Sequence, residues 1–395
     1  MRAYILILAV VLLTACSSAQ PPTPSTASAL TMTEPTTPLQ PSPTTRPATS
    51  SFTPTEPPAL RQPSPTSRPA GAPFFERARC FTSDLRGSLP SSGYDLVCGY
   101  LIVPEDRSQP EGRQVRLPVV VFRTQNPAPK PDPVIYLAGG GGFNIMPIVP
   151  FYVQLFGDGI LRNRDLVMYN QRGAPLSDPS LGCPGYGKLL YDLARRIDLS
   201  REERMTQKVT FLRDCRDDLV TQGINLEMYS STTNAADAND LRIALGYGQA
   251  NYYGTSYGTN LGLALIRDHP EGVRSIILDS VQPPQVAVNS ERAPNAHRAF
   301  VKLFEACAAD ETCRQTYPDL EATFYQVIDD LNASPVTTSA PGFEVSYGGG
   351  VFSEAVYSML VIGRAGSAPR AIYNAAEGDF RSIDPFIPDI LNAVP

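Results

Sequence analysis

The stretch Gly254-Thr255-Ser256-Tyr257-Gly258 decides the fold of this chain. An apolar run with strand character, residues 250–253, precedes it, and a helical apolar run, residues 261–266, follows it. A serine on a sharp turn between a strand and a helix is lifted to the top of a parallel sheet, where its hydroxyl faces solvent and substrate. The flanking glycines suit a strained turn between closely packed backbones, because a Cβ there would clash. The pattern therefore predicts that Ser256 is a nucleophile.

A serine hydroxyl needs a base to accept its proton and a carboxylate to orient that base. The chain contains two histidines, His269 and His297. His269 lies between the predicted helix and Pro270, where a histidine commonly closes a helix. His297 lies at the start of a later helical region, where an exposed helix residue is the simpler interpretation. Both remain candidate bases, and no histidine follows residue 297.

A run of four glycines, residues 139–142, follows a short apolar segment. A loop without side chains can direct backbone N–H groups at the oxygen that gains charge when a serine attacks a carbonyl. We therefore expect an oxyanion hole made by the N–H groups of Gly140 and of Tyr257, the residue after the serine. A tight turn is an alternative. A nucleotide-binding loop is another, although G-K-[ST] and the dinucleotide glycine spacing are absent from the sequence.

Strand and helix patterns alternate through the middle of the chain. Residues 95–103 and 115–122 predict two successive strands joined by a turn. The short, continuous apolar runs at residues 134–137 and 165–169 are typical of strands in a parallel sheet, and residues 273–279 predict the strand after the serine helix. A helix is expected over residues 234–245, with Asn234 as its cap. The alternation predicts an α/β fold with right-handed crossovers, and amphipathic segments from residue 291 onward predict a helical cap.

The N-terminal segment has the pattern of an export signal. Arg2 precedes an uncharged apolar run, residues 3–13, which is too short to span a bilayer. The following Leu13-Thr14-Ala15-Cys16 resembles a bacterial lipoprotein cleavage box and predicts a lipid-bearing Cys16. Residues 17–73, rich in Pro, Ser and Thr, predict an extended tether. We thus expect an extracytoplasmic protein that is lipid-anchored to the bacterial cell membrane.

Six further cysteines follow Cys16, and an even number in an exported chain favours three disulfides. Free buried thiols are the alternative. A metal site is not expected, because the chain has no C-x-x-C pattern. Of the fifteen possible connectivities, proximity along the chain favours the pairs Cys80 with Cys98, Cys183 with Cys215, and Cys307 with Cys313.

Composition limits the remaining possibilities. The net charge of −6 argues against a nucleic-acid partner, and the hydrophobic fraction of 42% is ordinary for a globular chain. The expected organisation is a signal peptide at residues 1–16, the tether at residues 17–73, a core at residues 74–290 and the helical cap at residues 291–395.

Several segments carry the pattern of one enzyme family. Residues 137–142 (L-A-G-G-G-G) resemble the H-G-G-P-G loop, and residues 170–173 (N-Q-R-G) resemble the D-Q-R-G motif, of the proline iminopeptidase and tripeptidyl aminopeptidase family of α/β-hydrolases. Residues 254–258 match the family's G-x-S-Y-G elbow, and residues 274–281 and 307–313 resemble its secreted tripeptidyl aminopeptidase branch. The resemblance implies an α/β-hydrolase sheet with a helical cap, no cofactor, and a serine exopeptidase that cleaves peptides with a free N-terminus.

The sequence departs from the family pattern in several places. Ala138 replaces a frequent histidine, Asn170 replaces an aspartate, and Pro175 stands where a glycine is common. Family members place the triad acid and histidine after the cap, and neither is identifiable in this chain. We therefore expect a sheet that is incomplete at its C-terminal edge, in a product that is truncated or completed by another polypeptide. Alone it is expected to be weakly active or inactive.

The predicted cap contains several acidic residues that could have roles in the site. Asp379, Asp384 and Asp389 are poor candidates for the triad acid, because solvated helix or loop positions explain them more simply. Glu305 and Glu321 are candidates for recognising the substrate amine. Two other functions remain open, a carboxylesterase on the same site and a non-catalytic lipoprotein that binds peptides.

Overall fold

The computed structural model of the protein describes residues 71–80, 95–194, 196, 199–340 and 343–390. All of them belong to one unit, Ala59–Pro395, while the other unit, Met1–Pro58, lies outside the described residues. The expected signal peptide, Cys16 and nearly all of the expected tether are therefore outside the described part of the chain.

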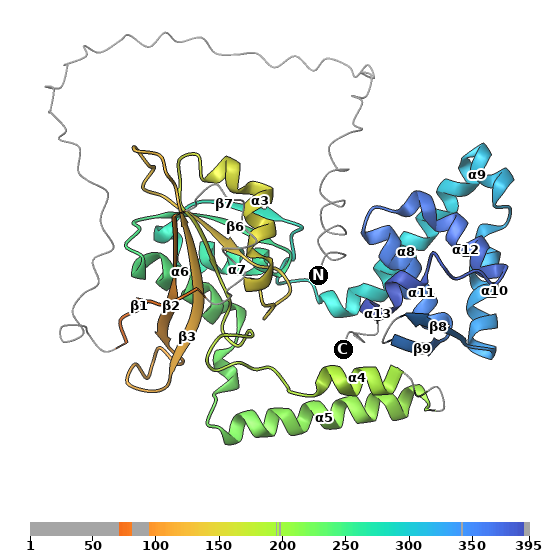
Figure 1. The fold of residues 1–395 in the computed structure, drawn as a ribbon, viewed down its shortest axis with the longest axis horizontal. Coiled ribbons are helices and arrows are strands. Elements are labelled where there is room, and N and C mark those ends of the chain that lie inside the picture. The colour runs from red at the N-terminus through yellow and green to blue at the C-terminus, as the bar shows by residue number, and fades with distance from the viewer. Residues whose placement is uncertain (1–70, 81–94, 195, 197–198, 341–342, 391–395) are drawn as a thin grey trace, which may run out of the picture. The chain divides into compact units, whose positions relative to one another are not determined.

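Within the described residues, seven strands form one sheet with the order β1-β2-β3-β5-β4-β6-β7 (Figure 1). The first three strands and the β3–β5 pair are antiparallel, whereas β5, β4, β6 and β7 are parallel. All strands expected from the sequence are present, and the α/β fold class is confirmed. The strands are β1 (Phe74–Arg77), β2 (Asp95–Pro104), β3 (Gln114–Arg123), β4 (Val134–Leu137), β5 (Leu166–Tyr169), β6 (Ala250–Thr255) and β7 (Val273–Asp279).

Helices cover both faces of this sheet, because successive residues of a strand point to opposite sides. Ile135 and Leu137 of β4 pack with α6 (Ser231–Ala244) and α7 (Tyr257–Asp268). Tyr136, which lies between them, packs with α3 (Val149–Ile160) on the other face. Each fully buried aliphatic side chain contributes about 1.5–3 kcal/mol, so this two-sided core fixes the positions of the strand ends.

The start of α6 differs from the prediction. Ser230, and not Asn234, caps the helix, and its Oγ accepts the N–H of Thr233. Asn234 is buried within the helix, where its Oδ1 accepts the N–H of Arg172 at 3.2 Å. The prediction was wrong because Ser230 is an equally good capping residue four positions earlier.

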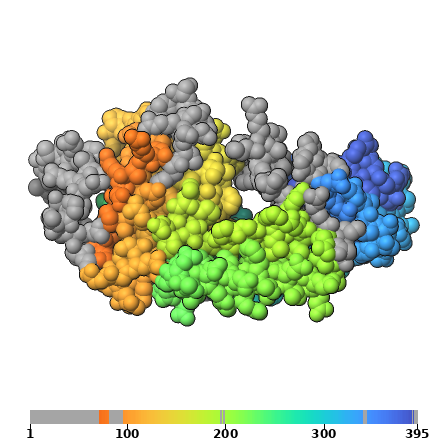
Figure 2. All heavy atoms as spheres, turned by 60° about the horizontal axis from the view of Figure 1, so that its bottom comes forward, coloured from red at the N-terminus to blue at the C-terminus, as the bar shows by residue number. Residues whose placement is uncertain are grey.

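A helical hairpin between β5 and α6 was not predicted from the sequence. It consists of α4 (Tyr186–Ala194) and α5 (Arg201–Thr221). A capping box starts α5, since Ser200 Oγ accepts the N–H of Glu203 and the Glu203 carboxylate accepts the N–H of Ser200. Figure 2 shows the outer surface of these helices in yellow-green and green.

The C-terminal part of the described chain is helical, as expected, and has its own hydrophobic core around Phe324 and Phe352. It also contains an antiparallel hairpin that the sequence did not reveal, β8 (Val336–Ala340) with β9 (Phe343–Tyr347). The helices are α8 (Val288–Ala309), α9 (Glu311–Thr316), α10 (Leu320–Ala333), α11 (Gly349–Val361), α12 (Ala368–Ala376) and α13 (Ile387–Ile390). Short 3₁₀ helices occur at Met146–Ile148, Leu226–Met228, Pro270–Gly272, Ala365–Ser367 and Asp384–Phe386.

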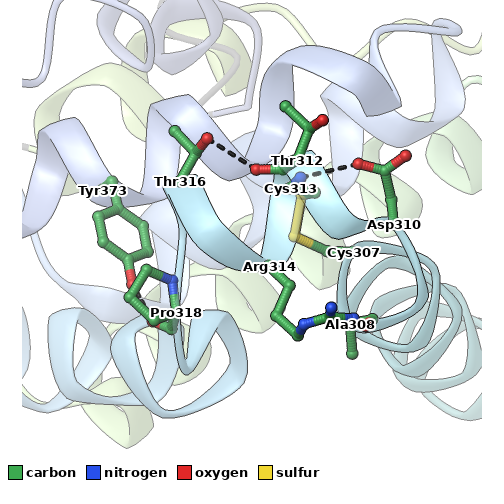
Figure 3. Close-up of a disulfide and its surroundings, with 9 residues drawn as sticks. All are labelled: Cys307, Ala308, Asp310, Thr312, Cys313, Arg314, Thr316, Pro318 and Tyr373. Carbon is green, nitrogen blue, oxygen red and sulfur yellow. Dashed lines mark hydrogen bonds between the residues drawn. A yellow bond between two sulfur atoms is a disulfide. The ribbon is translucent and has the colours of Figure 1, made fainter.

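The structure contains three disulfides, in the pairing that sequence proximity favours. Cys307–Cys313 joins α8 to α9, and Figure 3 shows that the N–H of Cys313 also donates to Asp310. The other two pairs are Cys80–Cys98 and Cys183–Cys215, the latter linking the segment before α4 to α5. Across the described ranges, every helix is too short or too polar to cross a bilayer.

Candidate active site

Ser256 lies on the turn between β6 and α7, and it is exposed. Its backbone has φ 52° and ψ −119°. A non-glycine residue in such a conformation costs on the order of 1–3 kcal/mol and persists only where its surroundings hold it. The structure therefore presents this serine on a strained turn at the carboxyl end of a central parallel strand.

The two glycines of the turn are required by close backbone contacts. A Cβ on Gly254 would lie 2.5 Å from the carbonyl oxygen of Gly258, and a Cβ on Gly258 would lie 1.9 Å from that of Leu137. Both distances are far below van der Waals contact. The steric reason that the sequence pattern suggested for the glycines is thus confirmed.

The four-glycine loop lies against this turn. A Cβ on Gly139 would be 3.0 Å from the carbonyl oxygen of Thr255 and 3.3 Å from Ser256 Cβ. Gly140 and Gly142 have φ values of 72° and 84°, a region that favours glycine. The loop is therefore shaped to bring bare backbone beside the serine.

Gln171 holds the glycine loop from both ends. Its Nε2 donates to the carbonyl oxygen of Ala138 at 2.9 Å, and its Oε1 accepts the N–H of Gly142 at 3.1 Å. Ala138 is thus bound through its backbone alone, so the histidine that is common in the family is not needed for this contact.

Tyr257 completes the arrangement. It is the first residue of α7, so its N–H has no acceptor within the helix. Its hydroxyl lies 3.0 Å from Ser231 Oγ, and its ring lies beside Gly141. The structure brings Ser256, the glycine loop and Tyr257 together, as the sequence analysis expected.

Asn170 explains one departure from the family pattern. Its Oδ1 accepts the N–H of Ile145 at 3.0 Å, while its Nδ2 donates to Asn144 Oδ1 and to the carbonyl oxygen of Pro175. An ionised aspartate has no hydrogen to donate. The amide at position 170 therefore fits both this loop and the neighbouring Pro175.

A buried ion pair anchors the segment after β5. Arg172 Nε and Nη2 each lie 2.7 Å from the carboxylate oxygens of Asp237 on α6, and both side chains have no exposed surface. Arg107 adds a second cation to Asp237 at 2.7 Å. Buried charges are tolerated when they are paired in this way, and sequence periodicity gives no indication of a contact between residues 65 positions apart.

Within the part of the chain that the structure describes, neither histidine is hydrogen-bonded to the Ser256 turn. His269 is the C-terminal cap of α7, so the 12-residue helix separates it from Ser256 by about 18 Å. Its Nδ1 is 3.4 Å from Asn239 Nδ2. His297 is exposed on α8. Among the described residues, no hydrogen bond joins the Ser256 hydroxyl to a histidine.

Asp279 is a carboxylate at the site that the sequence analysis did not single out. It ends β7 beside Thr255, and its carbonyl oxygen accepts the N–H of Ser256 at 2.9 Å. Its carboxylate accepts the hydroxyl of Tyr253 at 2.8 Å. Burial and this carboxylate raise the pKa of Tyr253 to about 12. Its place at the end of a predicted strand was the available clue, because such ends meet at one edge of a parallel sheet.

Three of the candidate acidic residues in the helical region have partners of their own. Asp379 accepts hydrogen bonds from Arg381, Asp384 accepts the hydroxyl of Tyr347, and Glu305 accepts Lys302 Nζ. Glu321 is exposed in the first turn of α10, and Asp389 lies in α13. The described residues contain no cluster of three or more His, Cys, Asp or Glu side chains that could hold a metal ion.

Two named proteins are similar to this chain in sequence. It is 28% identical over 246 residues to the serine protease Hip1 of Mycobacterium tuberculosis, a match that covers 59% of this chain and 45% of that protein. It is 28% identical over 192 residues to the tripeptidyl aminopeptidase of Streptomyces lividans, covering 48% of this chain and 36% of that protein. The chain therefore spans less than half the length of these relatives.

Solved structures and a family model complete the comparison. An alpha/beta hydrolase fold protein from Chitinophaga pinensis is 16% identical, with 64% of this chain and 60% of that chain covered and a TM-score of 0.28. An enantioselective mutant of the epoxide hydrolase from Aspergillus niger is 16% identical, with 71% and 60% covered and a TM-score of 0.27. The family model for the alpha/beta hydrolase fold matches residues 132–348, more than half of the 395 residues. The chain belongs to the α/β-hydrolase family.

Proposed function

We propose that this chain is a serine peptidase in which Ser256 is the nucleophile. The observation that carries the proposal is the exposed hydroxyl on a strained strand-to-helix turn, with a glycine loop packed against it. The relatives named serine protease and tripeptidyl aminopeptidase support a peptide substrate.

In the proposed reaction Ser256 Oγ attacks the scissile carbonyl and loses its proton to a general base. The carbonyl oxygen becomes an oxyanion, which accepts hydrogen bonds from the N–H groups of Gly140 and Tyr257. Collapse of the tetrahedral intermediate breaks the C–N bond, protonates the leaving amine and leaves an acyl-enzyme that water hydrolyses. We assign no base, because His269 lies at the far end of α7 and, among the described residues, His297 makes no hydrogen bond with Ser256.

The nucleophile is tested with a fluorophosphonate probe on the full chain. Because no base is assigned, we expect slow covalent labelling that peptide mapping assigns to Ser256 and that Ser256→Ala abolishes. Ser275→Ala is the matched control, since Ser275 is an exposed serine near the other end of the parallel strands. Labelling that survives Ser256→Ala would overturn the proposal.

For specificity, we propose an exopeptidase that acts on peptides with a free N-terminus. The name of the Streptomyces lividans relative favours this over a carboxylesterase. Anilides of Ala-Ala-Pro with a free or an acetylated amine separate the two functions. An exopeptidase cleaves only the anilide whose amine is free. Faster hydrolysis of short acyl esters than of this anilide would favour the esterase. Peptide binding without any labelling would favour a non-catalytic binding protein.

For localisation, we propose that the chain is exported and anchored to the membrane through a lipid on Cys16. The proposal is supported by the apolar run that ends at the cleavage-box sequence. Cells expressing the wild type should incorporate labelled fatty acid into the protein, and Cys16→Ser should not. Equal incorporation in both would contradict the anchor.

A further inference from the structure

The conformation of Ser256 is held by groups from two segments. Its N–H donates to the carbonyl oxygen of Asp279 at 2.9 Å. Its own carbonyl oxygen accepts both the N–H of Thr259 at 2.9 Å and the hydroxyl of Thr259 at 2.6 Å. Both peptide groups that flank the strained residue are therefore fixed by hydrogen bonds.

The Thr259 hydroxyl also makes a contact outside the helix. It accepts the N–H of Gln282 at 2.8 Å, so one buried hydroxyl bridges the serine turn and the segment that follows β7. The Thr259 hydroxyl and the carbonyl oxygen of Asp279 thus connect Ser256 to residues 279–282. This segment contains Ser280, which has φ 59° and, like Ser256, is a non-glycine residue with positive φ.

We propose that Thr259 is a positioning residue for the nucleophile, because its hydroxyl couples the Ser256 turn to residues 279–282. The inference rests on the proposed function of Ser256 and adds to it a side chain that touches no substrate. Removing the hydroxyl leaves the Ser256 carbonyl oxygen with the Thr259 N–H alone and leaves the Gln282 N–H without its acceptor. The serine then samples other conformations, and misplacement of a reacting group by about 1 Å costs as much as about 100-fold in rate.

The structure offers a closely matched control. Thr124 Oγ1 likewise donates to a carbonyl oxygen, that of Leu161 at 2.7 Å, and accepts a backbone N–H, that of Asn126 at 3.2 Å. It follows β3, whose end pairs with the start of β5, so it lies at the sheet edge opposite Ser256. Thr124→Val therefore removes the same pair of contacts away from the site.

The test measures fluorophosphonate labelling of the full chain, corrected for the folded fraction from an unfolding curve. We expect Thr259→Val to react about 10- to 100-fold more slowly than the wild type. Thr259→Ser, which keeps the hydroxyl, should stay within about threefold, and Thr124→Val within about twofold. Wild-type reactivity in Thr259→Val, or equally slow reaction in Thr259→Ser, would overturn the proposal.

Amide hydrogen exchange tests the same inference without relying on reactivity. Thr259→Val should speed exchange in peptides containing Ser256 and Gln282 by about fivefold or more, while Thr124→Val leaves them unchanged. If the wild type is not labelled at Ser256, the proposed function fails, and amide hydrogen exchange alone then tests the role of Thr259. Unchanged exchange in Thr259→Val would reject Thr259 as a positioning residue.

Discussion

The two ends of the parallel strands are held by different chemistry. At the amino ends, the Asp132 carboxylate accepts hydrogen bonds from Arg164, Arg274 and Asn251 at 2.6–2.8 Å. The neighbouring Asp165 accepts bonds from side chains or backbone of Arg123, Thr124 and Tyr247. The three bonds to Asp132 all reach its Oδ2, whereas those to Asp165 reach both carboxylate oxygens. These buried, paired carboxylates fix the amino ends of the strands.

At the carboxyl ends, glycines and strained turns lie around the serine, and the segment after β5 is held by the Arg172–Asp237 ion pair. Gly140, Gly142, Ser256 and Ser280 all have positive φ, and the Ser256 hydroxyl is exposed. Ligands of open α/β sheets bind at this edge. Strain at the carboxyl edge is tolerated because the amino edge and the core hold the strands in place.

The largest effect is expected from a methyl group at the strained edge. In Gly258→Ala the new Cβ would lie 1.9 Å from the carbonyl oxygen of Leu137, so the backbone must move. We expect a loss of about 4 kcal/mol or more of unfolding free energy, above the usual cost of overpacking, together with loss of fluorophosphonate labelling. Gly248→Ala, at the amino edge and with open space for its Cβ, is the control and should leave both unchanged.

The next effect concerns the ion pair beneath the carboxyl edge. Arg172→Met leaves the Asp237 carboxylate buried with Arg107 as its remaining cation. We expect a loss of about 3 kcal/mol, the low end for breaking a buried pair. Arg107→Met, which removes a partly exposed side chain, should cost about 1 kcal/mol or less. Denaturant unfolding measures both, and equal losses would show that the Arg172 pair is not a special anchor.

A smaller effect is the pH dependence of the stability that Asp132 contributes at the amino edge. Burial acts to raise the pKa of Asp132, but hydrogen bonds from Asn251, Arg164 and Arg274 outweigh it and lower the pKa to about 2. The folded-state pKa is below the ordinary value of 3.8, so this stabilisation is present above pH 4 and is lost as the pH falls towards 2. It amounts to about 2 kcal/mol.

Unfolding curves of wild type and Asp132→Asn between pH 5 and pH 2 measure this contribution. The difference in stability between them should shrink as the pH falls. Asp379→Asn is the control, because the pKa of Asp379 is also lowered to about 2, by hydrogen bonds from Arg381, but that arginine is 88% exposed. A difference that stays constant down to pH 2 would mean that the Asp132 contacts contribute no net stability.

Local pattern was sufficient to predict the parts of the molecule that depend on neighbouring residues. Strand β4 begins and ends where the apolar run does. The glycines on either side of Ser256 are also explained by the sequence, because their spacing implies that two backbone segments approach each other closely at the turn. The disulfide pairs were also favoured correctly, since each joins cysteines that are close in sequence.

Contacts between distant segments could not be predicted in this way. The Asp132 partners Asn251 and Arg274 are 119 and 142 positions away, and they meet only because β4, β6 and β7 are adjacent in the sheet. The same holds for Asp279, whose contact with Ser256 follows from the pairing of β6 with β7. Strand order, which one sequence does not encode as a local pattern, decides these contacts.

The smallest expected effect concerns a histidine at the amino edge. His269 ends α7, and Ser256 begins it, so the imidazole cannot reach the serine hydroxyl while the helix is intact. We expect His269→Ala to change the fluorophosphonate labelling rate by less than about twofold and to leave its pH dependence unchanged, because surface or capping substitutions rarely act at a distance. His297→Ala is measured beside it. If His269→Ala lowers labelling about 100-fold while the unfolding curve is unchanged, His269 acts as the base, and the division between a stabilising amino edge and a reactive carboxyl edge does not hold.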